Sequence, residues 1–169
     1  PDAYENIMSF DSMIKYDEKD KILVTYANRK LNELSIISKN DSRKLNEALY
    51  YILHTMDKCG LVNQKGYNIL IQLLALKIYD ENYNTQDLQF YINEEEANFS
   101  NIADEQLQEF LDRIEKIRNK AKSIYSKILD SETFDVTNIN HVKLMIQIVK
   151  QFQNYSFSDS KRNSLYQLV

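Results

Sequence analysis

Lysine and arginine side chains in the second half of the chain have the type and spacing that suggest a chemical role. Arg113, Lys120 and Lys127 lie seven residues apart, and Lys116 joins them on the face of a predicted helix opposite its apolar stripe. A row of cations matches the charge of a phosphate backbone, which lysine and arginine bind without reading the bases. The pattern therefore predicts a basic ridge that contacts DNA phosphates, to which the later chain adds Lys143, Lys150, Lys161 and Arg162.

The same charges have a simpler explanation in the helix dipole. Ten acidic residues and no lysine or arginine lie between Asp80 and Asp112, whereas ten basic and five acidic residues lie between Arg113 and Val169. The boundary falls inside one predicted helix, and acids at the start with bases at the end is the order that its dipole favours. The net charge of −4 and the pI near 5.3 argue against a free-standing nucleic-acid-binding protein and favour a helper surface in a larger assembly.

Residues suited to catalysis or metal binding are few and isolated. His54 and His141 lie 87 residues apart, Cys59 is the single cysteine, and none of them belongs to a standard catalytic or metal-binding motif. Two glycines in the whole chain cannot form a P-loop or a dinucleotide-binding loop. The acidic run 94–96 is most simply a solvated loop. The chain itself therefore does not look like an enzyme, and we expect no metal site or cofactor in it.

The hydrophobic pattern predicts an all-α protein, a bundle of about five to six helices. One proline and two glycines leave too few turn residues for a β-rich fold. We expect a leading segment or linker over residues 1–16 and one helical domain over residues 17–169. Within that domain the pattern predicts a short strand pair or hairpin near residues 86–93 and helices over residues 17–37, 42–59, 67–81, 102–129, 138–153 and 158–169.

The predicted helix from Tyr67 to Glu81 has an unusual composition. It is apolar nearly all round, with Gln72 and Lys77 the main exceptions, so we expect it at the centre of the bundle. It ends in Asp80 and Glu81, acids that the helix dipole disfavours at this end. Lys77 lies three and four residues before them, which predicts a local ion pair.

This helix and the elements after it resemble a known family. The helix ends in the run Lys77, Ile78, Tyr79, Asp80 and Glu81. It is followed by an extended aromatic segment at Leu88–Ile92 and by a long helix that includes Phe110–Tyr125. A single phenylalanine, Phe134, and another helix that ends in Ile148–Phe152 come next. This order resembles the helical amino-terminal domain of N6-adenine DNA methyltransferases, the modification subunits of type I restriction–modification systems. The resemblance covers residues 45–169. Residues 1–44 would then link to an upstream domain, such as the nuclease domain of a fused restriction–methylation enzyme.

The resemblance implies a non-catalytic accessory domain that aids DNA engagement and assembly. Binding of S-adenosylmethionine and catalysis would belong to a domain after Val169, because one proline and two glycines cannot supply the family's glycine-rich loop and its Asn-Pro-Pro-aromatic motif. The implied partners are DNA through helper contacts, that catalytic domain in cis, and a specificity subunit or a second modification subunit. The run from Lys77 to Glu81 is interpreted as structural, and no individual contact residue is carried over from the family.

Two other classes of function remain open on the sequence. A helical protein–protein interaction module unrelated to DNA would expose an apolar patch instead of a basic one, for which the candidates are Leu165, Tyr166, Leu168 and Val169. A small helical enzyme would need a buried cluster of titratable groups. The chain has no apolar run that could span a membrane and only one cysteine, so we expect a cytoplasmic location without a membrane partner.

Overall fold

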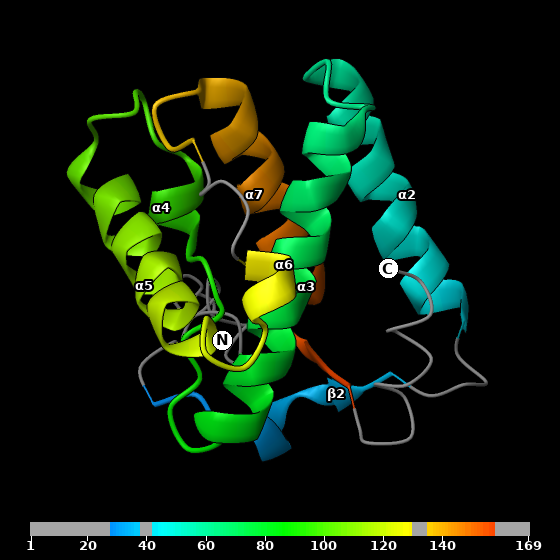
Figure 1. Ribbon diagram of the computed structural model, residues 1–169, viewed down its shortest axis with the longest axis vertical. Coiled ribbons are helices and arrows are strands. Elements are labelled where there is room, and N and C mark those ends of the chain that lie inside the picture. The colour runs from blue at the N-terminus through cyan, green and yellow to red at the C-terminus, as the bar shows by residue number, and fades with distance from the viewer. Residues whose placement is uncertain (1–27, 38–41, 130–134, 158–169) are drawn as a thin grey trace, which may run out of the picture.

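Helices dominate the computed structural model, which describes residues 28–37, 42–129 and 135–157 (Figure 1). Of these residues 65% are helical, which confirms the predicted all-α bundle. The six α-helices within the described ranges are α2 (Ser42–Lys58), α3 (Gln64–Tyr83), α4 (Glu94–Ala97), α5 (Glu105–Ala121), α6 (Ser126–Leu129) and α7 (Ile139–Phe152). The predicted leading segment and the predicted last helix over 158–169 lie outside these ranges, as do Lys161 and Arg162. No helix in the described ranges is long and apolar enough to cross a membrane.

Local signals in the sequence determine where α2 ends and α3 begins. Gly60 follows α2 with a φ of +68°, a backbone conformation that favours glycine and commonly ends helices. Asn63 then caps α3, because its side chain accepts a hydrogen bond of 3.0 Å from the N–H of Gly66. A Cβ atom on Gly66 would lie 1.9 Å from the carbonyl oxygen of Leu61, so this close approach of the two backbones requires glycine.

The core of the bundle is built around α3 and α7. α7 packs against α2 and α3, and α3 packs in addition against α5 and α6. Nearly every residue of α3 from Ile69 to Glu81 is buried, which confirms the central position expected for a helix without a polar face. α2 instead buries a single stripe, formed by Ala48, Ile52 and Met56, and leaves its opposite side exposed.

A short parallel strand pair joins the two ends of the described chain. β2 (Ser35–Ile36) pairs with β3 (Tyr155–Ser156), and the N–H of Ile37 donates to the carbonyl of Ser156 over 3.1 Å. The prediction of a helix over 17–37 is therefore wrong for residues 28–37, which form a 3₁₀ turn, η1 (Leu31–Glu33), followed by β2. Hydrogen bonds to a segment more than a hundred residues away override the local helical pattern.

Residues 86–93 contain no strand, so the predicted position of the strand pair is wrong. The segment is held by one backbone hydrogen bond, from the N–H of Leu88 to the carbonyl of Arg29 over 2.8 Å, and by side chains. The N–H of Ile92 donates to the Gln153 side chain over 2.9 Å, and the N–H of Phe90 donates to Asp80 over 3.0 Å. Leu88, Phe90 and Ile92 are buried while their neighbours are partly exposed, which produces the alternation typical of a strand without a strand partner.

The single helix predicted over 102–129 is in fact two helices. α5 ends at Ala121, and α6 begins at Ser126 after a tight turn. Arg118, in the last turn of α5, is 1% exposed, and its guanidinium donates a hydrogen bond of 2.7 Å to the carbonyl of Leu129 at the end of α6. The apolar stripe continues from α5 through the turn to α6, and periodicity alone therefore does not reveal the break.

Candidate functional site

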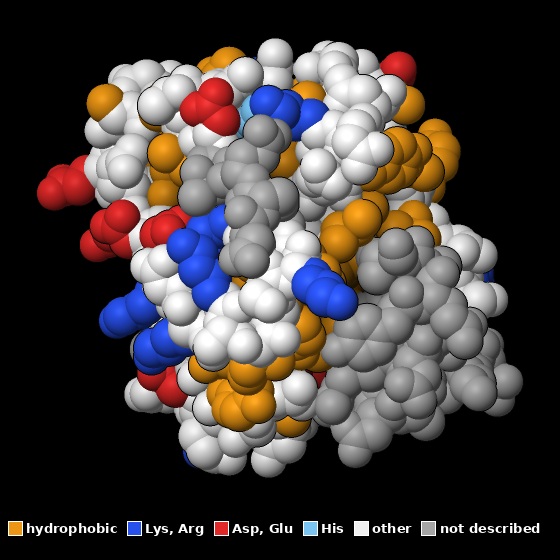
Figure 2. Space-filling model, viewed as in Figure 1, with side chains coloured by type: hydrophobic (Ala, Val, Ile, Leu, Met, Phe, Trp, Pro, Cys, Tyr) orange, Lys and Arg blue, Asp and Glu red, His pale blue; other side chains and the backbone are white. Residues whose placement is uncertain are grey.

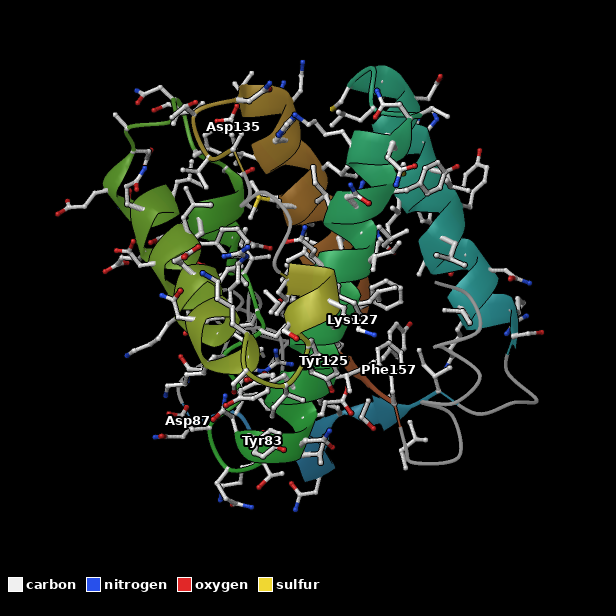
Figure 3. All side chains as sticks on the ribbon, in the orientation of Figure 1. Tyr83, Asp87, Tyr125, Lys127, Asp135 and Phe157 are labelled. Carbon is white, nitrogen blue, oxygen red and sulfur yellow. The ribbon has the colours of Figure 1, made fainter. Side chains whose placement is uncertain are left out.

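Two exposed lysines of α5 border a shallow depression near the carboxyl end of that helix. The depression has a volume of about 230 Å³ and is lined by Lys116, Ile117 and Lys120 of α5 and by Asn84, Asp87 and Gln89 of the segment after α3. Lys116 and Lys120 are one helical turn apart, so their ammonium groups are neighbours. Figure 2 shows Lys and Arg side chains gathered over the lower part of α5, below a group of acidic side chains. Asp87 adds one carboxylate to this basic area (Figure 3).

Lys127 extends the basic area onto α6. Its side chain is exposed, and Figure 3 shows it on α6 in front of α3, close to Tyr125. α6 packs against both α3 and α5, so the two basic segments form one corner of the bundle. Lys122, in the turn between α5 and α6, is exposed as well and was missed from the sequence, although it lies in the same basic stretch. We call Lys116, Lys120, Lys122 and Lys127 the α5–α6 lysines.

Arg113 is not part of this exposed group, which corrects the predicted ridge. Its guanidinium forms a two-pronged ion pair with Glu96, with N–O distances of 2.7 and 3.1 Å, and donates to the carbonyl of Tyr91 over 2.9 Å. It also stacks on the Tyr91 ring, 3.8 Å from the ring centroid. Glu96 itself is buried in α4, so the expectation of a solvated acidic loop at 94–96 is wrong for this residue. Arg113 balances the Glu96 carboxylate and ties α5 to α4.

Lys143 and Lys150 lie on α7 and form a separate exposed pair. Burial raises the pKa of the Cys59 thiol, just after α2, and the charge of Lys143 partly opposes this shift. α7 packs against α2 and α3, whereas α5 and α6 pack against α3 and against each other. The basic residues predicted as one ridge thus divide into two groups on different parts of the bundle.

The run from Lys77 to Glu81 is part of the protein interior. Lys77 and Glu81 form an ion pair with an N–O distance of 3.3 Å, and their side chains are 1% and 2% exposed. Glu81 also accepts the N–H of Phe157 over 2.9 and 3.1 Å, which fixes the end of β3 against α3. Asp80 accepts N–H groups of the extended segment after α3, and Ile78 and Tyr79 are buried in the core. These contacts support the structural interpretation of the run.

Burial shifts the protonation of two of these groups. It lowers the pKa of Lys77 below the ordinary 10.5, although the charges of Glu81 and Asp80 oppose the shift. It raises the pKa of Asp80 above 3.8, although hydrogen bonds from Asn84, Phe90 and Gln89 favour the charged form. The cluster is the kind of feature expected of a small helical enzyme. However, its carboxylates are occupied by backbone N–H groups, and none of the three residues lines the depression on α5.

The remaining residues that suggested catalysis lie apart from one another. His54 is exposed on α2, and His141 is buried in the first turn of α7. Burial raises the pKa of Cys59, which disfavours the reactive thiolate. Within the described ranges, no three His, Cys, Asp or Glu side chains are grouped so that they could hold a metal ion.

An exposed aromatic face on α2 is the second surface feature that sequence reasoning missed. Tyr50, Tyr51 and Leu53 are 65%, 45% and 42% exposed. Leu53 belongs to the apolar pattern of α2 but lies outside its buried stripe, which is formed by Ala48, Ile52 and Met56. The sequence indicates such a face, because α2 has more apolar residues than a single buried face can hold.

Comparisons with protein-family models, curated proteins and solved structures found no match to this chain. Functional inference therefore rests on the residues and their arrangement.

Proposed function

We propose that this chain is a non-catalytic helical accessory domain of an N6-adenine DNA methyltransferase of a restriction–modification system, aiding DNA engagement and the assembly of domains and subunits. The family assignment rests on the resemblance of the Lys77–Glu81 run and of the order of elements after it. Under this proposal, S-adenosylmethionine binding and base methylation belong to a catalytic domain outside this chain. DNA, that catalytic domain and a specificity or second modification subunit are the partners, in the cytoplasm.

The proposed DNA contact is carried by one observation, the grouping of the α5–α6 lysines at one corner of an otherwise acidic protein. All four side chains are exposed, and the exposed acids nearest to them on α5 are Asp112, four residues before Lys116, and Glu115, directly before it. Lysine side chains bind phosphates as mobile point charges, which position a duplex without reading its sequence. Asp87 weakens the attraction at the depression, which suits a helper surface better than a tight binding site.

A salt titration of duplex binding tests this contact. We would measure fluorescence anisotropy of a labelled duplex against this chain and against the double variant Lys116→Glu/Lys120→Glu. Each lost phosphate contact should reduce the slope of log affinity against log salt by about 0.9. The matched control is Lys143→Glu/Lys150→Glu, which makes the same change of charge on exposed positions of α7.

The two double variants separate a local contact from a general charge effect. We expect the α5 variant to bind more weakly, with a smaller salt slope, and the α7 variant to stay close to the unmodified chain. Equal weakening by both would mean that net charge alone drives binding. No binding of the unmodified chain at about 20 mM salt would remove the proposed DNA contact altogether.

A helical protein–protein interaction module remains a second candidate, because the structure has the exposed apolar face that this function requires. That face lies on α2, on residues that no described segment covers. The two functions differ in their test, since an interaction module would bind no duplex even at low salt.

A further inference from the structure

The outer face of α2 has the properties of a binding surface. Its buried stripe packs on α7, and Tyr50 and Tyr51 are exposed next to each other on the outer side of the helix. A single exposed apolar residue is ordinary on a protein surface, but adjacent large ones form a patch that usually has a partner. Figure 2 shows hydrophobic side chains on the side of the molecule where α2 lies.

The aromatic rings of this face are already ordered by their neighbours. Tyr50 and Tyr51 meet edge to face with ring centroids 5.5 Å apart. Tyr50 also stacks on His54, with centroids 6.3 Å apart and ring planes 6° from parallel. Rings held in this way lose little conformational freedom on binding, which lowers the entropic cost of an interface.

The polar residues around the rings favour a second copy of the same face as the partner. A two-fold symmetric interface must be complementary to itself. Glu47 lies three residues before Tyr50, and His54 lies three residues after Tyr51. When two α2 helices pack antiparallel with the dyad between Tyr50 and Tyr51, each Glu47 therefore lies opposite the His54 of the other copy. Both side chains are exposed, so an imidazole N–H can donate to the carboxylate at two symmetric places.

The outer charges fit the same arrangement. Arg43 lies seven residues before Tyr50, and Asp57 lies six residues after Tyr51, so the two are at nearly equal height in the antiparallel pair. Lys58 is level with Arg43 along the helix axis too, but it follows Asp57 by one residue, and the rotation of about 100° per residue places it on the opposite side of the interface from Asp57. Opposite charges thus meet along one side, and Arg43 and Lys58 stay apart.

We propose that this chain forms a homodimer in which the α2 faces of two copies pack antiparallel around Tyr50 and Tyr51. The rings form the apolar centre of the interface, and the Glu47–His54 and Arg43–Asp57 pairs surround it. The α5–α6 lysines are on other helices and take no part, so the dimer is independent of the proposed DNA contact.

Sedimentation velocity over about 2–200 μM protein tests the dimer. The unmodified chain should change from monomer to dimer mass in this interval. Tyr50→Ser/Tyr51→Ser should raise the dissociation constant more than about tenfold, because exposed rings at the centre of an interface carry most of its affinity. Tyr83→Ser is the matched control, since Tyr83 is 59% exposed at the carboxyl end of α3 and should leave the dimer intact (Figure 3). Circular dichroism checks that each variant is folded.

A charge exchange tests the antiparallel register. Glu47→Arg places a cation opposite His54 and should weaken the dimer, and Glu47→Arg/His54→Glu restores opposite charges and should strengthen it again. A chain that stays monomeric throughout, a dimer that survives loss of both tyrosines, or an exchange variant no stronger than Glu47→Arg would each overturn the proposal.

Discussion

Removing the charge of Lys77 should destabilise the fold strongly, because it leaves a buried carboxylate without its cation. Lys77→Met keeps an unbranched apolar side chain in place of the lysine, whose ammonium lies 5.5 and 5.9 Å from the ring centroids of Phe90 and Phe157. What is lost is the attraction to Glu81 at 3.3 Å. At an effective dielectric constant of about 20 this attraction is worth about 5 kcal/mol.

The expected loss in free energy of unfolding is somewhat smaller than this attraction. Lys77→Met also removes the cost of keeping an ammonium group buried, a cost that appears as the lowered pKa of Lys77. Breaking a buried pair by removing one partner usually costs about 3–5 kcal/mol. We therefore expect a loss in this interval, measured by urea unfolding at pH 7 and followed by far-ultraviolet circular dichroism.

The double variant Lys77→Met/Glu81→Gln is the control that isolates the orphaned charge. It removes both charges, and the amide oxygen of Gln can still accept the N–H of Phe157. Because neutral replacement of a buried ion pair is often nearly neutral in stability, the double variant should be more stable than Lys77→Met by about 2 kcal/mol or more. If the double variant is as unstable as Lys77→Met, the loss comes from packing, and the electrostatic reasoning is refuted.

Two further predictions concern Asp80, near the carboxyl end of α3, and the two glycines around the start of that helix. Folded Asp80 has a pKa above 3.8, so the folded protein takes up this proton at a higher pH than the unfolded chain does. Acidification towards pH 3.8 should therefore stabilise the unmodified protein relative to Asp80→Asn. Urea unfolding at several pH values should show the free energy of unfolding of the unmodified protein rising relative to that of Asp80→Asn as pH falls. A difference between the two free energies that does not change with pH would contradict the raised pKa. Gly60→Ala meets no atom within 4 Å and should lose only about 1–2 kcal/mol to its positive φ, whereas Gly66→Ala collides with Leu61 and should lose about 3 kcal/mol in thermal or urea unfolding. Equal losses would mean that the chain near Leu61 moves aside without cost.

Local signals explain the parts of the fold that were predicted correctly. α7 begins after Asn138, which accepts the N–H groups of Asn140 and His141, and it spans nearly the residues that its apolar spacing predicts. The ion pair expected between Lys77 and the acids that follow it is present, because residues four apart on a helix are neighbours whatever surrounds them. Features set within one helical turn are recoverable from sequence.

The candidate site was predicted only in part, because the sequence does not show which charges are exposed. Arg113 and Lys116 are three residues apart on α5, yet Arg113 is occupied by Glu96 and Lys116 reaches solvent. That difference depends on where α4 packs. Arg118 was not considered at all, since a guanidinium inside the protein is recognisable only through the Leu129 carbonyl that accepts its hydrogen bond.

The sequence by itself determined the helical class, the central place of α3 and the ends of α2 and α7, because hydrophobic periodicity, caps and glycines act over a few residues. α3 begins three residues before and ends two residues after the predicted range 67–81. Only the tertiary structure decided the β2–β3 pairing, the break between α5 and α6, the ion pair of Arg113 with Glu96 and the exposure of the α2 rings. Each of these depends on which distant segment supplies a hydrogen bond, a counter-charge or a covering surface. The position of that segment is a property of the whole packed chain.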